Sequence, residues 1–482
     1  MKIFRLSIVA ALMLAPGSVA QAQSPAPLAD LLPDMILRDI TLPRAPTGLS
    51  HEAHFSPIEG DELDNPAVGI VRNFNKLMMV QLSTFPLASS AGGFTYTFDS
   101  TLGTFRRASS SFGPAFAERS LTIGRGKFNA GFSYQHTTYD NFEGQNLGNR
   151  SIKIYLRHTD CCRSGSGGGS GSGGGGGGGG TGSGSGPVEQ PNGTRLDPPF
   201  EGDVIEAALA MTAKSDTAAF SFNYGLTNRW DVGLVVPVVH VALDADVQAT
   251  IMRLATTSDP LTHTFEVGNP NATQKSFRQS GTATGIGDVV MRTKYRVVGG
   301  GNTGLAGALD LRLPTGDQDN LLGSGGQAKI FLVQSSGTDR IMQHANVGYT
   351  SSWGHVPNAG LLSLIGGEEP MPDEINYAAG VEFVVESRLT VIGDILGRSL
   401  RDAGRLDVVS KPFVFEGRTA PETMLFDEFE PRSGNLNLTL GTVGVKFNPV
   451  GNFLVSANVL FPLGNTGLRS KLSTVIGLDY TF

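Results

Sequence analysis

Hydrophobic and polar residues alternate along most of the chain after residue 125, and the last thirteen residues show the pattern clearly. In SKLSTVIGLDYTF (470–482), one face of an extended strand carries Leu472, Thr474, Ile476, Leu478, Tyr480 and Phe482. The residues between them are mostly polar, because successive side chains of a strand point to opposite faces. The segment therefore predicts a strand with one apolar face that ends on an aromatic residue.

The same alternation recurs in earlier segments, so the chain is predicted to be all-β and antiparallel. Comparable segments are 128–134, 152–156, 220–224, 230–238, 289–297, 305–313, 377–383 and 453–461. Counting between residue 126 and the end gives about 14 strands, with 12–16 as the range that the pattern allows.

The pattern fits a soluble β-sandwich or a transmembrane β-barrel, and three features favour the barrel. The chain ends on Phe482, aromatic residues lie near the ends of apolar faces, and short connections alternate with long ones. Aromatic girdles and short periplasmic turns opposite longer outer loops are typical of outer-membrane barrels. In such a barrel the apolar faces contact lipid and the charged faces line the lumen. We interpret Leu478, Tyr480 and Phe482 as a signal for the outer-membrane assembly machinery.

The chain is divided into a signal peptide (1–22), an irregular segment (23–125) and the barrel (126–482). Lys2 and Arg5 precede a short apolar stretch and the A-x-A site at 20–22, which indicates export. The irregular segment is a candidate plug inside the barrel, with a set of extra strands or a periplasmic extension as the alternatives. The Gly/Ser-rich insert 164–186 predicts a disordered coil. Strand counting places this insert on the periplasmic side, where a long connection fits badly.

Composition supports a barrel and excludes other classes. Hydrophobic residues make up 40% of the chain and mean hydropathy is −0.04, which is too low for a helical membrane protein. The formal net charge of −7 argues against a nucleic-acid partner. The two cysteines, Cys161 and Cys162, are adjacent, and we interpret them as loop residues; a vicinal disulfide is the alternative.

Charged residues on the polar faces are the candidate lumen and solute-path residues. They are Asp288, Arg292, Lys294, Arg296, Asp310, Arg312, Glu382 and Lys446. They form either a charged constriction that selects solutes or a salt-bridged network that holds the barrel shut.

Neither a metal site nor a catalytic motif stands out. Asp317, Asp319 and Asn320 offer closely spaced oxygens, but the later glutamate of a calcium loop is missing, so an ordinary turn is favoured. No G-x-S-x-G or H-E-x-x-H sequence occurs, and we expect no enzyme and no cofactor. A hydrolase remains an alternative, because its triad would be assembled across strands.

Two neighbouring motifs give a family resemblance. Residues 285–298 (GIGDVVMRTKYRVV) and 309–325 (LDLRLPTGDQDNLLGSG) combine a G-x-G-D strand with a following L-P-T-G-D loop. In this the chain resembles the outer-membrane β-barrel family named after the MetA pathway of phenol degradation. The resemblance implies a barrel that takes up small, often aromatic molecules, and it implies no catalytic residues.

These observations predict a bacterial outer-membrane channel for passive uptake of small hydrophobic or aromatic molecules. Its partners are outer-membrane lipids, the assembly machinery and a small solute. A structural or adhesive barrel with a closed lumen is the first alternative, and an outer-membrane hydrolase is the second.

Overall fold

The computed structural model describes residues 26–43, 55, 66–84, 89, 93–99, 104–157, 202–255, 263–300, 302–356, 369–416 and 421–482. The predicted signal peptide (1–22), the Gly/Ser insert (164–186) and both cysteines lie outside these residues. None of the described helices is both long and apolar enough to cross a membrane.

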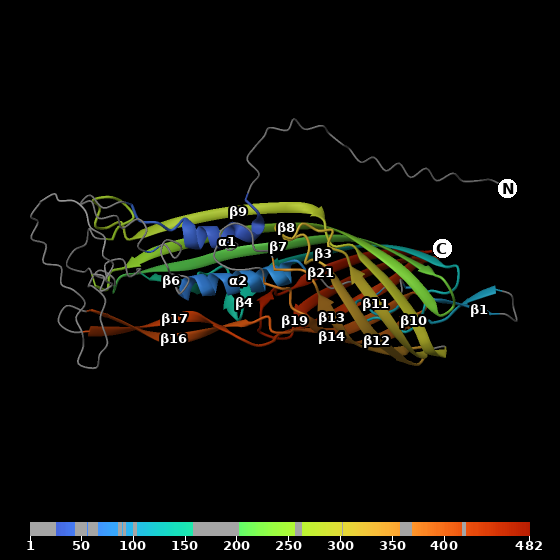
Figure 1. Ribbon diagram of the computed structural model, residues 1–482. Helices are drawn as coiled ribbons and strands as arrows, with labels where there is room; N and C mark the ends of the chain where they lie inside the picture. The colour runs from blue at the N-terminus through green and yellow to red at the C-terminus, as the bar shows by residue number, and fades with distance from the viewer. Residues whose placement is uncertain are drawn as a thin grey trace, which may run out of the picture.

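Among the described residues, twelve antiparallel strands close into a barrel (Figure 1). Around the ring they are β7 (Val204–Gly225), β3 (Phe128–Tyr139), β21 (Ser473–Thr481), β19 (Phe453–Pro462), β18 (Leu436–Val450), β15 (Leu389–Leu400), β14 (Glu374–Glu386), β13 (Ile341–Ser352), β12 (Gln327–Gly337), β11 (Thr303–Arg312), β10 (Val290–Gly300) and β8 (Trp230–Met252). Strand β8 pairs with β7, and the closing strand β21 pairs with β3. The sheet therefore has no free edge in the ring.

The sheet has the expected 14 strands, and the ring of twelve lies at the lower limit of the expected range of 12–16. The sheet contains two further strands, β6 (Ile152–Arg157) and β9 (Gln274–Ile286). Strand β6 pairs with the first residues of β7 beyond the end of β3, and β9 pairs with β8 beyond the start of β10. Beyond the ring, β6 takes the place of β3 beside β7, and β9 takes the place of β10 beside β8. The alternation of side chains cannot distinguish such a strand from an additional strand of the ring.

One end of the barrel carries tight turns and Phe482, and the other carries long connections; we name these the turn end and the loop end. Short connections at 225–229, between Gly300 and Thr303, and at 451–452 join ring strands at the turn end. Residues Arg157 and Val204, which flank the Gly/Ser insert, are paired at the loop end. The connection that contains the insert therefore starts and ends at the loop end, and its expected placement beside the short turns is wrong because β3 and β6 run in one direction.

Side chains on the ring strands alternate between an exposed apolar face and a buried polar one. The exposed set includes Tyr134, Phe220, Tyr224, Trp230, Met291, Tyr295, Ile330, Val347, Tyr377, Ile395, Val443, Ile476, Leu478 and Tyr480. The exposed fraction is 67% for Ile330 and 56% for Val443, but 0% for Glu382 and 1% for Lys294. An apolar exterior around a polar interior is the reverse of a soluble sandwich and matches a membrane barrel.

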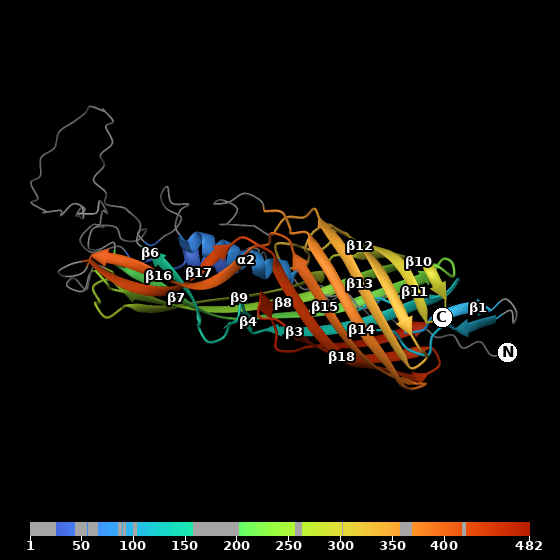
Figure 2. The ribbon, with the colours of Figure 1, turned by 90° about the horizontal axis from the view of Figure 1, so that it is seen from below.

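Strands β7 and β8 are 22 and 23 residues long and extend far beyond this apolar band (Figures 1 and 2). The outer face changes from Phe220 to Asp216 along β7, and Asp216 pairs in register with His240. Residues 204–217 therefore continue past the band for roughly 45 Å of strand length, at about 3.3 Å per residue.

The projecting strands enclose a second core, which we name the head. Its helices are η1 (Leu28–Asp30), α1 (Leu31–Pro33), η2 (Asp34–Arg38) and α2 (Pro66–Leu82). They pack against β6–β9 and against the hairpin of β16 (Arg405–Glu416) and β17 (Pro421–Arg432). Helix α2 begins at a proline, which suits a first helical position. Two helical stretches thus lie within the segment expected to be irregular.

The remaining strands are short and lie at the two ends. A hairpin of β1 (Tyr96–Asp99) and β2 (Thr104–Arg107) extends beyond the turn end (Figure 1). Strands β4 (Asn141–Phe142), β5 (Gln145–Asn146) and β20 (Leu468–Arg469) form a small sheet between barrel and head.

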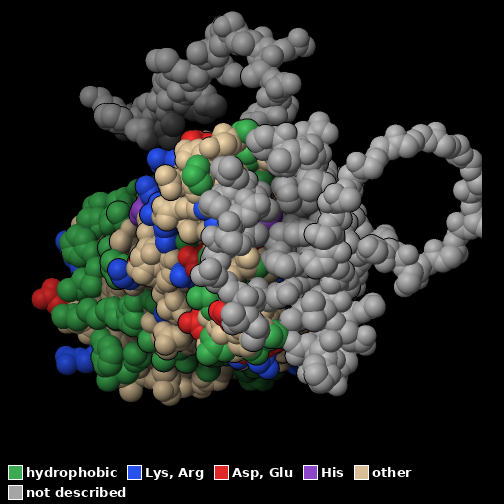
Figure 3. All heavy atoms as spheres, turned by 90° about the vertical axis from the view of Figure 1, so that its left-hand side faces the viewer, with side chains coloured by type: hydrophobic (Ala, Val, Ile, Leu, Met, Phe, Trp, Pro, Cys, Tyr) green, Lys and Arg blue, Asp and Glu red, His purple; other side chains and the backbone are tan. Residues whose placement is uncertain are grey.

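Seen from the loop end, acidic and basic side chains are intermingled near the centre and hydrophobic ones gather on one flank (Figure 3).

Candidate functional site

A cavity of about 280 Å³ lies between two pieces of the N-terminal region and the barrel wall. On the head side it is lined by Gln81 and Thr84, at and just after the end of α2. On the opposite side it is lined by Phe116 and Glu118, which belong to residues 109–123, named here the inner segment. Residues of β3, β10–β15 and β18–β21 complete the wall.

Ion pairs between the inner segment and β10 form one side of this cavity. The Arg292 guanidinium donates through Nε and Nη2 to the two oxygens of Asp310, each at 2.6 Å. Its Nη1 donates to Glu118 at 3.0 Å, and Lys294 Nζ donates to the other Glu118 oxygen at 2.8 Å. Arg292 and Asp310 are register partners on β10 and β11, so the bidentate pair follows from the sheet. Glu118 thus ties the inner segment to the wall.

The backbone of the inner segment is held by carboxylates of other strands. Asp394 Oδ2 accepts from the amides of Ala115, Phe116 and Ala117 at 3.0, 2.8 and 3.4 Å. Glu382 accepts from the Gly113 amide at 2.8 Å. The segment lacks a β-ladder here, so its buried amides need side-chain acceptors.

Further contacts of the same kind continue on both sides of that anchor. Lys446 Nζ donates to the carbonyl oxygens of Pro114 at 2.8 Å and Phe112 at 3.3 Å. Asp231 on β8 accepts from the amide of Ile123 at 2.9 Å. Acidic and basic wall residues therefore bind amides and carbonyls of one segment, which fixes its path along the wall.

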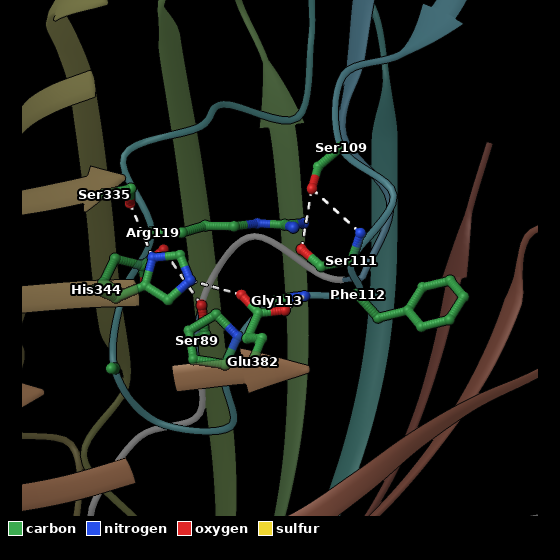
Figure 4. A network of polar contacts seen from close by, with 12 residues as sticks. Ser89, Ser109, Ser111, Phe112, Gly113, Arg119, Ser335, His344 and Glu382 are labelled. Atoms are coloured by element: carbon green, nitrogen blue, oxygen red, sulfur yellow. Dashed lines mark hydrogen bonds and ion pairs between the residues drawn. The ribbon is translucent and has the colours of Figure 1, made fainter. Parts of the chain in front are cut away.

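Ser335, His344 and Glu382 form a continuous chain of contacts on β12, β13 and β14 (Figure 4). Ser335 Oγ lies 2.8 Å from His344 Nδ1, and His344 Nε2 lies 2.5 Å from Glu382 Oε1. Each residue is at most 3% exposed, and Ser335 Oγ also accepts from the amide of Ser120 at 2.9 Å. The ring nitrogens are used in the opposite order from a serine-hydrolase triad, and the hydroxyl is engaged in anchoring. The geometry suits a structural clasp.

Two basic residues characterise the part of the cavity nearer the head. Arg398 donates to Thr84 Oγ1 at 2.5 Å and also pairs with Glu374, so it joins the end of α2 to the wall. The Lys329 ammonium lies 4.8 Å from the centre of the Phe331 ring. Within the described part of the chain, no carboxylate oxygen lies within 4.0 Å of Lys329 Nζ.

The structure places the eight predicted lumen residues in three environments. Arg292, Lys294, Asp310, Glu382 and Lys446 are on the inner face, and Arg312 also lines the cavity. Arg296 donates to the Asn228 carbonyl near the turn end. Asp288 is buried in the β9–β10 connection, where it accepts from the amides of Gly316 and Ser324 and fixes the 314–326 loop.

The other predicted residues have structural roles in the described region. Leu478 and Tyr480 lie on the exposed face of β21, and the Phe482 amide donates to the Phe128 carbonyl at 2.7 Å. Both Asp317 oxygens accept from Asn320, whose own Oδ1 accepts from the Leu28 amide. The Asp319 carbonyl accepts from Ala29. The described residues hold no cluster of three or more acidic, histidine or cysteine side chains suited to a metal.

Sequence reasoning did not single out Glu118, Asp394, Arg398, His344 or Lys329. Asp394 shares a face of β15 with Thr390 and Ile392, so alternation along that strand was a usable signal. Glu118 lies in a segment without periodicity, and only its contacts reveal its role.

Comparisons with known proteins give a family match and several low-similarity structures. Residues 187–391 match the family model described as "Putative MetA-pathway of phenol degradation". No curated protein matches the chain.

Three solved structures illustrate the structural matches. An outer membrane channel from Pseudomonas putida F1 has 10% identity over 75% of this chain and 98% of that chain, with a TM-score of 0.38. A Pseudomonas aeruginosa FadL homologue has 10% identity over 83% and 98%, with a TM-score of 0.32. The P. putida toluene transporter TodX has 10% identity over 74% and 90%, with a TM-score of 0.30. These identities and TM-scores are low, and the barrel fold is established by the strand pairing of this chain. The resemblance predicted from residues 285–298 and 309–325 is confirmed: over residues 187–391 the chain matches the MetA-pathway family of phenol degradation.

Proposed function

We propose that the protein is an outer-membrane channel for passive uptake of small molecules, with the inner segment as its plug. The observation that carries this proposal is a closed barrel with an apolar exterior and a cavity inside its wall. A ring without free strand edges satisfies its backbone internally, which is what a bilayer requires of spanning strands.

The orientation follows from the connections. Short turns are expected on the periplasmic side and longer loops outside. We therefore place the turn end in the periplasm and the head outside the cell. A solute then enters below the head, reaches the cavity and passes the inner segment before it leaves at the turn end.

The proposed substrate class is small hydrophobic or aromatic molecules. The family match supports it, and Phe116, Leu440 and Leu460 give the cavity an apolar side. Charged residues line the rest of the cavity, so a solute contacts both apolar and charged groups. The charged groups therefore contribute to the selection of solutes.

A structural barrel with a closed lumen is the second candidate, because wall residues on several strands anchor the inner segment. Each anchor adds to the cost of moving it. A hydrolase receives less support, since the Ser335 hydroxyl is buried and already bonded.

Liposome swelling tests the proposal with purified protein and a series of aromatic and hydrophilic solutes of similar size. We expect faster entry of the aromatic solutes than in empty vesicles. Permeability equal to that of empty vesicles for every solute contradicts the channel and favours the closed barrel. Stable open pores in planar bilayers contradict the closed barrel.

A further inference from the structure

We propose that the cavity binds a small organic anion, with Lys329 and Arg312 as the groups that hold its negative charge. This proposal deepens the proposed function and rests on it in one respect, because the cavity is taken to be the solute path. The ligand class is an aromatic or aliphatic body that carries one carboxylate. Neither the family match nor the family resemblance assigns such a site.

The balance of charge around the cavity favours an anion. Its described lining contains five basic side chains, Arg292, Arg312, Lys329, Arg398 and Arg469, and three acidic ones, Glu118, Asp310 and Glu374. The whole chain has a net charge of −7, so this excess is opposite in sign to the composition. Field lines are focused in a cavity with low-dielectric walls, which raises the local concentration of small anions.

The carboxylates near Lys329 are already engaged. Asp310 is the register partner of Lys329 on β11, but both its oxygens accept from Arg292. Glu374 pairs with Arg398 on β15. The Lys329 ammonium is left over the Phe331 ring, inside a cavity wall where an uncompensated charge is costly. A bound carboxylate supplies the missing counter-charge.

Arg312 stands next to Lys329 on the same wall. It is the last residue of β11 and pairs in register with Gln327 on β12, two residues before Lys329. Both side chains line the cavity. A guanidinium presents paired donors that match a carboxylate, and an ammonium adds a compact point charge. Together the two side chains form the proposed binding site for the carboxylate.

The other side of the cavity accommodates an apolar body. Phe116, Leu396, Leu440 and Leu460 line it, and the Phe331 ring adds an apolar surface next to Lys329. Its volume of about 280 Å³ is just below the usual range of ligand pockets, roughly 300 to 1,000 Å³, so the ligand is small. A neutral arene satisfies the apolar side alone and leaves Lys329 without a counter-charge.

Titration calorimetry on the purified full chain in detergent tests the proposal, with benzoate as the anionic probe and benzyl alcohol as the neutral one. We expect benzoate to bind more tightly than benzyl alcohol. We expect K329Q to weaken benzoate binding by about tenfold or more, since one charge-assisted bond is lost. Binding of benzyl alcohol should change little.

Lys275→Gln is the matched control. Lys275 lies 4.9 Å from the centre of the Phe277 ring two residues later on β9, the same arrangement as Lys329 and Phe331, and it does not line the described cavity. Equal benzoate affinity in wild type and K329Q, or equal affinity of wild type for both probes, overturns the proposal. R312Q provides a second variant, and heat-modifiable mobility on gels confirms that each barrel is folded.

The binding assay is independent of permeation. Benzoate that binds in detergent but does not cross proteoliposome membranes contradicts the channel and supports the site. Permeation of aromatic solutes without a benzoate preference, and without an effect of K329Q, supports the channel and contradicts the site.

Discussion

Replacing Asp394 by alanine should release the inner segment from the barrel wall. The carboxylate accepts three consecutive amides, and the two shorter bonds measure 2.8 and 3.0 Å. A buried amide left without an acceptor costs about 1–3 kcal/mol, so two of them cost about 2–6 kcal/mol. Water that enters the vacated space recovers part of this. We expect a net loss of about 3 kcal/mol, which is a factor of roughly 100 in the released population.

Hydrogen exchange with mass spectrometry measures this population directly. Amides of residues 113–118 should exchange roughly 100-fold faster in D394A, by the free-energy conversion above, while β-ladder amides stay protected. Asp394→Asn keeps an oxygen that can accept and should have a smaller effect. Planar bilayers should show more frequent openings in D394A.

Asp216→Ala is the control for Asp394→Ala. Its carboxylate belongs to the same barrel but bonds Tyr134 and His136 on the outer face of β3. Exchange of residues 113–118 should therefore match the wild type. If D394A leaves exchange at 113–118 unchanged while the barrel is folded, the three bonds do not hold the inner segment, and the reasoning is refuted.

Three further predictions concern the head, the Ser335–His344–Glu382 chain of contacts and the closing strand β21. Burial, with Asp34 and Asp319 nearby, raises the pKa of Asp30 to about 6. The folded head therefore binds this proton more tightly than the unfolded chain, so its stability is highest below pH 4, falls as pH rises through 6 and stays lower above it. D30N should slow amide exchange in residues 28–38 at pH 7.5 by up to about tenfold and change little at pH 4; an equal effect at both pH values contradicts the pKa shift. S335A should leave any ester hydrolysis by the purified protein unchanged and speed exchange at Ser120, and loss of a measured esterase rate would restore the hydrolase. F482A should strongly reduce the amount of folded barrel in the outer membrane while the purified protein still refolds in detergent, because Phe482 is 61% exposed and packs at the surface against Phe128 and Tyr480. Normal assembly in cells contradicts its role as a signal.

The barrel wall was largely predictable, because alternation is a local property of sequence. Tyr224, Tyr295 and Tyr377 lie on the exposed face, and Lys294, Glu382 and Lys446 on the buried one, as the strands predict. The exact number of strands in the ring could not be predicted. Strand β6 pairs with β7 beyond the end of β3, and its side chains alternate as those of a ring strand do.

The interior contacts could not be predicted, because their partners have no periodic signal. Asp394 and Glu382 bind backbone amides of residues 113–117, and an amide is the same group in every residue but proline. The core of the head could not be predicted either. Leu209 and Met211 lie on the face of β7 that lines the lumen further along the strand, but in the head they pack against the helices.

The path of the N-terminal region constrains the order of assembly. Helix α2 is at the loop end and the β1–β2 hairpin is at the turn end, while Ser89, between them, donates to the Ala115 carbonyl. The polypeptide is thus threaded lengthwise through a ring whose last seam, β3 with β21, joins the first and final ring strands in the sequence. Once that seam forms, the head helices can pass through the ring only if they unfold. We therefore expect the helices and the hairpin to reach opposite ends of the barrel before β3 pairs with β21, so that this pairing is the step that fixes the arrangement.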